Sequence, residues 1–128
     1  MNQQTLSRRV LVVDDNADAA QLVADFMSLK GYVVAIANGG REALETAEKF
    51  TPDVIFLDIG MPGMDGYEVA TALRKAATLP TPRIIALTAW GDAASRERTA
   101  ACGFNAHLVK PARLESLLSE AILDASPH

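Results

Sequence analysis

The sequence contains a single cysteine, Cys102, so no disulfide can form within the chain. One cysteine fits a reducing compartment, and we expect a cytoplasmic protein. No apolar run reaches the roughly 18 residues that a membrane span needs, so we expect no contact with a membrane. The formal net charge of −4 lacks the positive excess that is typical of nucleic-acid-binding domains, so we expect no direct binding of nucleic acid.

The length of 128 residues fits one domain. Short apolar runs alternate five times with apolar stripes at helical spacing, and they predict strands at 10–13, 32–37, 54–57, 83–87 and 106–109. We expect a flexible N-terminal tail over residues 1–7, the domain over 8–124 and a C-terminal tail over 125–128. Strict strand–helix alternation predicts a parallel, doubly wound α/β sheet with helices on both faces.

Two strands are apolar throughout, 10–13 and 54–57, which predicts that they lie in the middle of the sheet. The short strand 106–109 suits an edge. The first helix is indicated by a stripe at helical spacing, made of Ala19, Leu22, Val23, Phe26 and Leu29. The fourth helix, expected over 92–102, has a poor apolar stripe, with Ala93, Ala100 and Ala101 as its core-facing candidates. Cys102 is expected to be a small buried residue.

Polar residues stand at the ends of four of the five expected strands, namely Asp14, Asp15, Asp58, Thr88 and Lys110. Ligands of open α/β sheets bind beyond the carboxyl ends of the strands, so these side chains predict one shared site. Three carboxylates repel one another unless a cation is present, and a set of oxygen ligands suits Mg²⁺. The simpler alternative is that Asp14 or Asp15 only caps the first helix, although Asn16 or Asp18 could do so instead.

Asp58 ends an apolar strand and precedes a loop rich in Gly and Pro, from Gly60 to Gly66. A carboxylate can act as a nucleophile and form an aspartyl phosphate. Phosphoryl transfer needs positioning and charge neutralisation, which Mg²⁺ and Lys110 could supply, while Thr88 offers a hydroxyl group. Taken singly, a Thr at a strand end or a Lys before Pro is unremarkable, and only their joint placement indicates function.

These motifs resemble the receiver domains of two-component response regulators over nearly the whole chain, from about Arg8 to Leu123. The resemblance rests on the acidic pair after the first strand, the stretch 57–66 around Asp58, Thr88-Ala89 after the fourth strand and Lys110-Pro111 after the fifth. It implies a flavodoxin-like fold with five helices and the strand order 2-1-3-4-5, an order for which this family is a standard example. It also implies a cis peptide bond between Lys110 and Pro111.

The resemblance assigns a role to each site residue. Asp58 would accept a phosphoryl group from a phosphohistidine on a histidine kinase or a histidine phosphotransfer protein, and the domain would later dephosphorylate itself. Asp15, Asp58 and the backbone carbonyl of Gly60 would bind Mg²⁺ directly, and Asp14 mostly through water. Lys110 would pair with Asp58 and then with the phosphoryl group, toward which Thr88 would swing.

One position departs from the family pattern. Three residues before the lysine the family usually has Tyr or Phe, which changes rotamer with the threonine, and here the residue is His107. A His there resembles receivers attached to hybrid sensor kinases, and the alternative is an edge-strand residue with no switching role. As a switch residue, His107 could make the response depend on pH. By analogy Gly60 and Trp90 flank the site and tune the lifetime of the phosphoryl group, and simple packing is the alternative for Trp90.

The expected output is a change in the face made by the fourth helix, fifth strand and fifth helix, which would bind a downstream protein. A phosphatase of the haloacid dehalogenase type is the first competing function, but it needs a second Asp two residues after the first, where this chain has Asn16. A flavodoxin is disfavoured because the first loop is acidic. A degenerate receiver that only binds partners is disfavoured by the complete set of site residues.

Overall fold

A computed structural model of the protein describes residues 8–76, 82–89, 91 and 93–125. Its centre is one five-stranded parallel sheet with the order β2-β1-β3-β4-β5. The strands are β1 (Arg9–Val13), β2 (Val33–Ala37), β3 (Val54–Asp58), β4 (Arg83–Thr88) and β5 (Ala106–Val109). The expected order, the interior places of β1 and β3 and the edge place of β5 are all confirmed.

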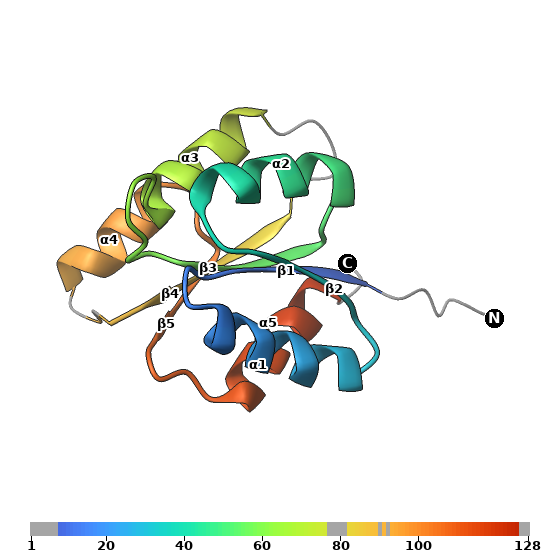
Figure 1. The fold of residues 1–128 in the computed structure, drawn as a ribbon. Helices are drawn as coiled ribbons and strands as arrows, with labels where there is room; N and C mark the ends of the chain where they lie inside the picture. The colour runs from blue at the N-terminus through green and yellow to red at the C-terminus, as the bar shows by residue number, and fades with distance from the viewer. Residues whose placement is uncertain (1–7, 77–81, 90, 92, 126–128) are drawn as a thin grey trace.

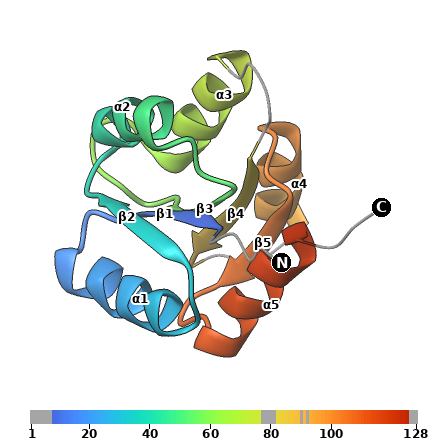
Figure 2. The ribbon, with the colours of Figure 1, turned by 90° about the vertical axis from the view of Figure 1, so that its right-hand side faces the viewer.

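Five helices cover the sheet: α1 (Ala17–Leu29), α2 (Gly40–Phe50), α3 (Gly66–Ala76), α4 (Ala93–Ala101) and α5 (Leu114–Ala125). Helices α1 and α5 lie on one face, and α2, α3 and α4 lie on the other (Figures 1 and 2). The flavodoxin-like doubly wound fold is therefore confirmed. Asp92 and Trp90 lie outside the described residues, as do the tail residues 1–7 and 126–128.

The sheet separates two apolar clusters because alternate residues of each strand point to opposite faces. Leu11 and Val13 of β1 face the cluster under α2 and α3, whereas Val10 and Val12 face the cluster under α1 and α5. β3 is buried along its whole length, including its last residue, Asp58. Burial on both faces is why β1 and β3 read as unbroken apolar runs.

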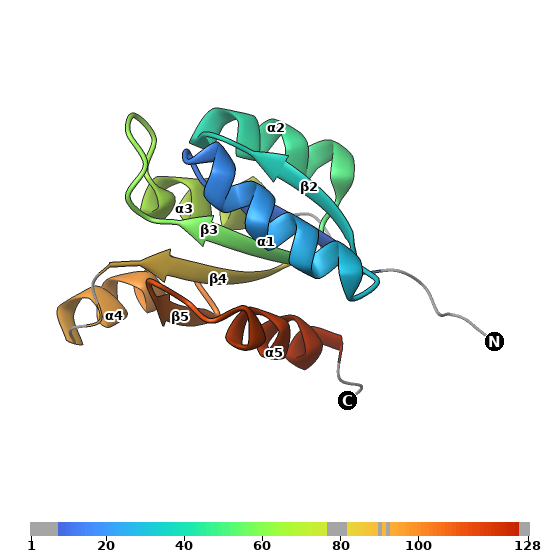
Figure 3. The same ribbon diagram turned by 60° about the horizontal axis from the view of Figure 1, so that its bottom comes forward.

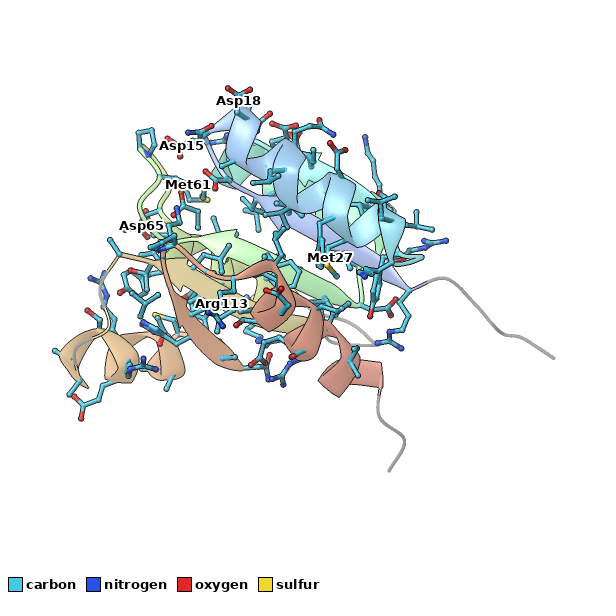
Figure 4. The ribbon with its side chains drawn as sticks, turned by 90° about the horizontal axis from the view of Figure 1, so that it is seen from below. Asp15, Asp18, Met27, Met61, Asp65 and Arg113 are labelled. Carbon is cyan, nitrogen blue, oxygen red and sulfur yellow. The ribbon has the colours of Figure 1, made fainter. Side chains whose placement is uncertain are left out.

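The helix that the apolar stripe predicted is present, but only part of the stripe faces the core: Val23 and Phe26 pack against the buried cluster. The buried residues of α1 are Ala20, Ala24 and Met27, and Met27 lies between α1 and the sheet in Figure 4. Leu22 and Leu29 are instead 61% and 85% exposed. Small alanines let the helix approach the sheet closely, so the inner face is centred on residues that a search for large apolar side chains overlooks.

The expected inner face of α4 is wrong. Ala93, Ala100 and Ala101 are exposed, and Thr99 is the only residue of α4 that is buried. The Thr99 hydroxyl donates to the Arg96 carbonyl at 2.9 Å, so a polar residue can occupy the inner face with its hydrogen bond made. Cys102, just after α4, is half-buried against the core rather than fully buried.

The strands all point to one end of the sheet, which places their carboxyl ends together. In Figure 3 the arrowheads of β3 and β4 point toward the loop that leads into α3 and toward the start of α1. Among the residues that the structure describes, no helix is both long and apolar enough to span a membrane.

Candidate functional site at the carboxyl ends of the strands

Three carboxylates meet at this end of the sheet. One oxygen from each of Asp14, Asp15 and Asp58 lies within 4.8 Å of the others. Asp14 and Asp58 are buried, at 6% and 5% exposure, while Asp15 is exposed. Figure 4 shows Asp15 at this end, near the loop that carries Met61 and Asp65. The sequence therefore predicted correctly which acids come together.

The loop after β1 shows that neither acid of the pair caps α1. The cap is Asn16, whose side-chain oxygen accepts from the amide of Ala19 at 3.0 Å. Asp18, labelled at the start of α1 in Figure 4, is exposed. Oδ1 of Asp14 accepts from the amide of Asn16 at 2.9 Å. Asp14 thus shapes the turn, and the capping alternative for the acidic pair is wrong.

Asp58 is paired with the lysine that the sequence indicated. Nζ of Lys110 donates to Oδ1 of Asp58 at 2.9 Å, and it lies 3.9 Å from Oδ2 of Asp14. The amide of Gly60 also donates to Oδ1 of Asp58, at 3.2 Å. Both of these bonds to Asp58 use Oδ1, so neither of them occupies Oδ2.

The backbone at the end of β5 aims the lysine at this site. The Lys110–Pro111 peptide bond is cis, as expected. The amide of Lys110 donates to the carbonyl of Thr88 at 2.7 Å, which joins the ends of β4 and β5. Thr88 is buried, at 1% exposure, and ends β4 next to β3. Lys110 therefore leaves the sheet beside Thr88, which was predicted to belong to the same site.

The turn from β3 into α3 leaves no room for a side chain at Gly66, the first residue of the helix. A Cβ built there would lie 2.6 Å from the carbonyl oxygen of Asp58 and 2.7 Å from Cα of Ile59. A reciprocal capping box starts the helix: Oδ1 of Asp65 accepts from the amide of Glu68, and Oε1 of Glu68 accepts from the amide of Asp65. The loop is therefore closed tightly behind Asp58.

Burial dominates the electrostatics of Asp14. Desolvation raises the pKa of Asp14 above its usual value of 3.8, and the neighbouring charges of Asp58 and Asp15 raise it further. The bond from the amide of Asn16 and the charge of Lys110 act in the opposite direction but do not cancel the rise. A cation would relieve this unfavourable burial of negative charge. The oxygen-only donor set therefore fits a hard ion such as Mg²⁺.

His107 points toward α4. Its Nδ1 lies 3.1 Å from Oγ1 of Thr99. The Thr99 hydroxyl also donates to the carbonyl of Arg96, so it joins β5 to the backbone of α4. The pH response predicted for His107 stays a prediction.

One residue of the site has no counterpart among the sequence-based candidates. Nδ2 of Asn38 donates to the carbonyl oxygen of Asp14 at 2.8 Å. Asn38 is the first residue after β2, so the rule that found the other site residues at strand ends could have found it too. An Asn before two glycines reads first as a turn residue, which is why the signal was missed.

Fold and site together define a phosphoacceptor domain of the signalling type. The chain belongs to the family described as "Response regulator receiver domain", which matches residues 10–122. Relatives include the response regulator MprA of Mycolicibacterium vanbaalenii, 38% identical over 87% of this chain and 47% of that protein. Another is the probable transcriptional regulator ycf27 of Guillardia theta, 42% identical over 80% of this chain and 39% of that protein.

Solved structures agree with this assignment. The chemotaxis protein CheY4 of Vibrio cholerae superposes with a TM-score of 0.86 and 35% identity, covering 92% of this chain and 98% of that chain. The receiver domain of a Francisella response regulator gives a TM-score of 0.84 and 29% identity, covering 93% and 98%. The chain spans about half the length, or less, of the first curated relatives that it matches.

Proposed function

We propose that Asp58 accepts a phosphoryl group from a phosphohistidine on a histidine kinase or a histidine phosphotransfer protein. Oδ2 of Asp58 forms the new O–P bond while the P–N bond to the partner's imidazole breaks, and the imidazole nitrogen keeps the electron pair. The observation that carries this proposal is the 2.9 Å bond from Lys110 to Oδ1 of Asp58 beside two further carboxylates. It leaves one oxygen of Asp58 as the nucleophile.

The remaining site residues neutralise charge. Lys110 stays close enough to move from Asp58 to an incoming phosphoryl oxygen, and Thr88 supplies a hydroxyl donor from the end of the neighbouring strand. Bound Mg²⁺ would offset the negative charge of carboxylates and phosphoryl group, with Asp15, Asp58 and the Gly60 carbonyl as direct ligands and Asp14 acting through water. These ligand roles are taken from the family pattern, and the carboxylate cluster supports those of Asp14, Asp15 and Asp58.

The reaction is reset by water. Attack of water on phosphorus breaks the O–P bond of the aspartyl phosphate, which returns the carboxylate and releases inorganic phosphate. We propose that the domain catalyses only this hydrolysis and its own phosphorylation, so it acts as a signalling device rather than as an enzyme on a separate substrate. Gly60 and Trp90, which flank the site in the sequence, are proposed to tune the lifetime of the phosphoryl group.

The signal is proposed to leave through the face of α4, β5 and α5, which would bind a downstream protein. Thr88 ends the strand beside β5, and His107 of β5 contacts Thr99 of α4, so a movement of Thr88 has a short path to that face.

Direct contact with nucleic acid is not proposed for these residues. A transcriptional output like that named for ycf27 would require a further domain. The cytoplasmic location stays a prediction from the single cysteine.

Incubation with acetyl phosphate and Mg²⁺, followed by intact-mass spectrometry, tests the proposal. The wild-type chain should gain one phosphoryl group, and Asp58→Asn should gain none while keeping its circular dichroism spectrum. Asp18→Asn is the matched control, because Asp18 is an exposed acid at the same end of the molecule and outside the cluster. Equal labelling of the wild-type and Asp58→Asn chains would refute the proposal.

A further inference from the structure

The peptide group between Asp14 and Asp15 is anchored by a side chain from a different loop. Nδ2 of Asn38 donates to the Asp14 carbonyl at 2.8 Å, between residues 24 positions apart. The backbone brings Asn38 there, because the amide of Asp14 donates to the carbonyl of Ala37 at 3.1 Å and so continues the pairing of β1 with β2. The contact follows directly from the register of the two strands.

The peptide group on the other side of Asp15 is anchored as well. The amide of Asn16 donates to Oδ1 of Asp14 at 2.9 Å, and the side chain of Asn16 caps α1. A residue has only two soft backbone torsions, and each is a rotation against one of the flanking peptide planes. Fixing both planes therefore fixes the direction in which the Cα–Cβ bond of Asp15 leaves the backbone. Asp15 is exposed, so packing contributes little to this direction.

We propose that Asn38 is a positioning residue that aims the Asp15 carboxylate at the metal site. This inference rests on the proposed function, since it assigns to Asp15 a direct bond to Mg²⁺. Mg²⁺ demands near-ideal octahedral geometry, so a ligand whose backbone can rotate binds it less well. Residues that orient a metal ligand typically change metal affinity by about 10- to 100-fold when they are removed.

The competing explanation is that Asn38 only stabilises the turn between β2 and α2. The backbone of Asn38 does take part in that turn, because its amide donates to Oε1 of Glu42 at 3.0 Å. This bond uses the main chain and survives replacement of the Asn38 side chain. Removing the Glu42 carboxylate loosens the same turn while leaving the Asn38 amide in place. The two explanations can therefore be separated by variants of neighbouring residues.

The test uses Asn38→Leu, which keeps the approximate size without a donor, Asn38→Ala as a second replacement, and Glu42→Ala as the control. Isothermal titration calorimetry gives the dissociation constant for Mg²⁺, and thermal unfolding with a chelator gives the metal-free melting temperature. We expect both Asn38 variants to weaken Mg²⁺ binding by about 10-fold. The rate of acetyl phosphate labelling should fall at low Mg²⁺ and recover at saturating Mg²⁺. Glu42→Ala should lower the melting temperature without this loss.

Three outcomes would count against the inference. Asn38 variants that bind Mg²⁺ as tightly as the wild-type chain would overturn it and leave the proposed function intact. An equal loss of Mg²⁺ affinity in Glu42→Ala would assign the effect to the order of the turn and would also overturn it. A wild-type chain that binds no Mg²⁺ would overturn the proposed function itself, and with it the premise of this inference.

Discussion

The ammonium nitrogen of Lys110 lies 2.9 Å from Oδ1 of Asp58 and also within 4 Å of Asp14, so one cation faces two buried carboxylates. If Lys110 neutralises charge during phosphoryl transfer, Lys110→Ala should slow labelling by acetyl phosphate by about 100-fold, the scale of losing one charge-stabilising donor. Lys110→Arg keeps the positive charge on a group of different shape, so its labelling rate should lie between the rates of the wild-type chain and Lys110→Ala. Stopped-time mass spectrometry measures the rates. A Lys110→Ala rate equal to wild type would show that the lysine has no part in the chemistry.

The absence of a side chain at Gly66 lets the loop after β3 fold back closely on the backbone of Asp58. A Cβ at Gly66 would meet the Asp58 carbonyl at 2.6 Å, and main-chain atoms cannot move aside as a flexible side chain would. We expect Gly66→Ala to lower the free energy of unfolding by about 1–3 kcal/mol and to slow labelling of Asp58.

Gly39→Ala is the control for this substitution, since a Cβ at Gly39 meets nothing within 4 Å. Urea unfolding measures the stability, and labelling with acetyl phosphate reports the displacement of Asp58. A Gly66→Ala chain as stable as Gly39→Ala would contradict the steric explanation.

Asp14 should destabilise the metal-free protein at neutral pH. Burial raises the pKa of Asp14, so between 3.8 and the raised value the folded chain holds more protons than the unfolded chain. Stability from this group is therefore present below 3.8 and falls as pH rises through the raised value. Asp14→Asn keeps an acceptor for Asn16 and removes the charge, so with a chelator at pH 7 it should be more stable than wild type.

The advantage of Asp14→Asn should shrink as the pH falls through this window, because the wild-type carboxyl is then neutral too. Added Mg²⁺ should stabilise the wild-type chain more than the variant. Urea unfolding over a pH series, with and without Mg²⁺, measures both effects. A variant that is less stable than wild type at pH 7 in chelator would show that Asp14 contributes more by its contacts than it costs by its burial.

Thr99 connects α4 to β5 through His107. Thr99→Val removes the hydroxyl that contacts Nδ1 of His107 at a buried position, which should cost about 1–3 kcal/mol of unfolding free energy. Thr99→Ser keeps the hydroxyl and should cost less. Amide hydrogen exchange should speed up in α4 in the valine variant, since this helix buries no other residue among those described. Unchanged exchange in α4 would show that the helix is held by other contacts.

The fold and most of the site followed from sequence because both depend on local patterns. β1 and β3 are buried on both faces, which leaves unbroken apolar runs, and each run ends in the acid that serves the site. The inner face of α4 was predicted wrongly and the most buried residues of α1 were not indicated, because Ala20, Ala24 and Thr99 are small or polar and give a weak apolar signal. Asn38 was missed because its partner, the Asp14 carbonyl, comes near only after β1 pairs with β2.

Identifying the residue that carries the phosphoryl group most directly tests the central claim that Asp58 is the phosphoacceptor. After labelling of the wild-type chain with acetyl phosphate and Mg²⁺, borohydride reduces an acyl phosphate to the alcohol, and peptide mass spectrometry then finds homoserine in place of the phosphorylated aspartate. The account predicts homoserine at position 58, with Asp14, Asp15 and Asp65 unchanged. Homoserine at another acid, or a labelled chain with no reducible residue, would contradict the assignment of Asp58 as the phosphoacceptor.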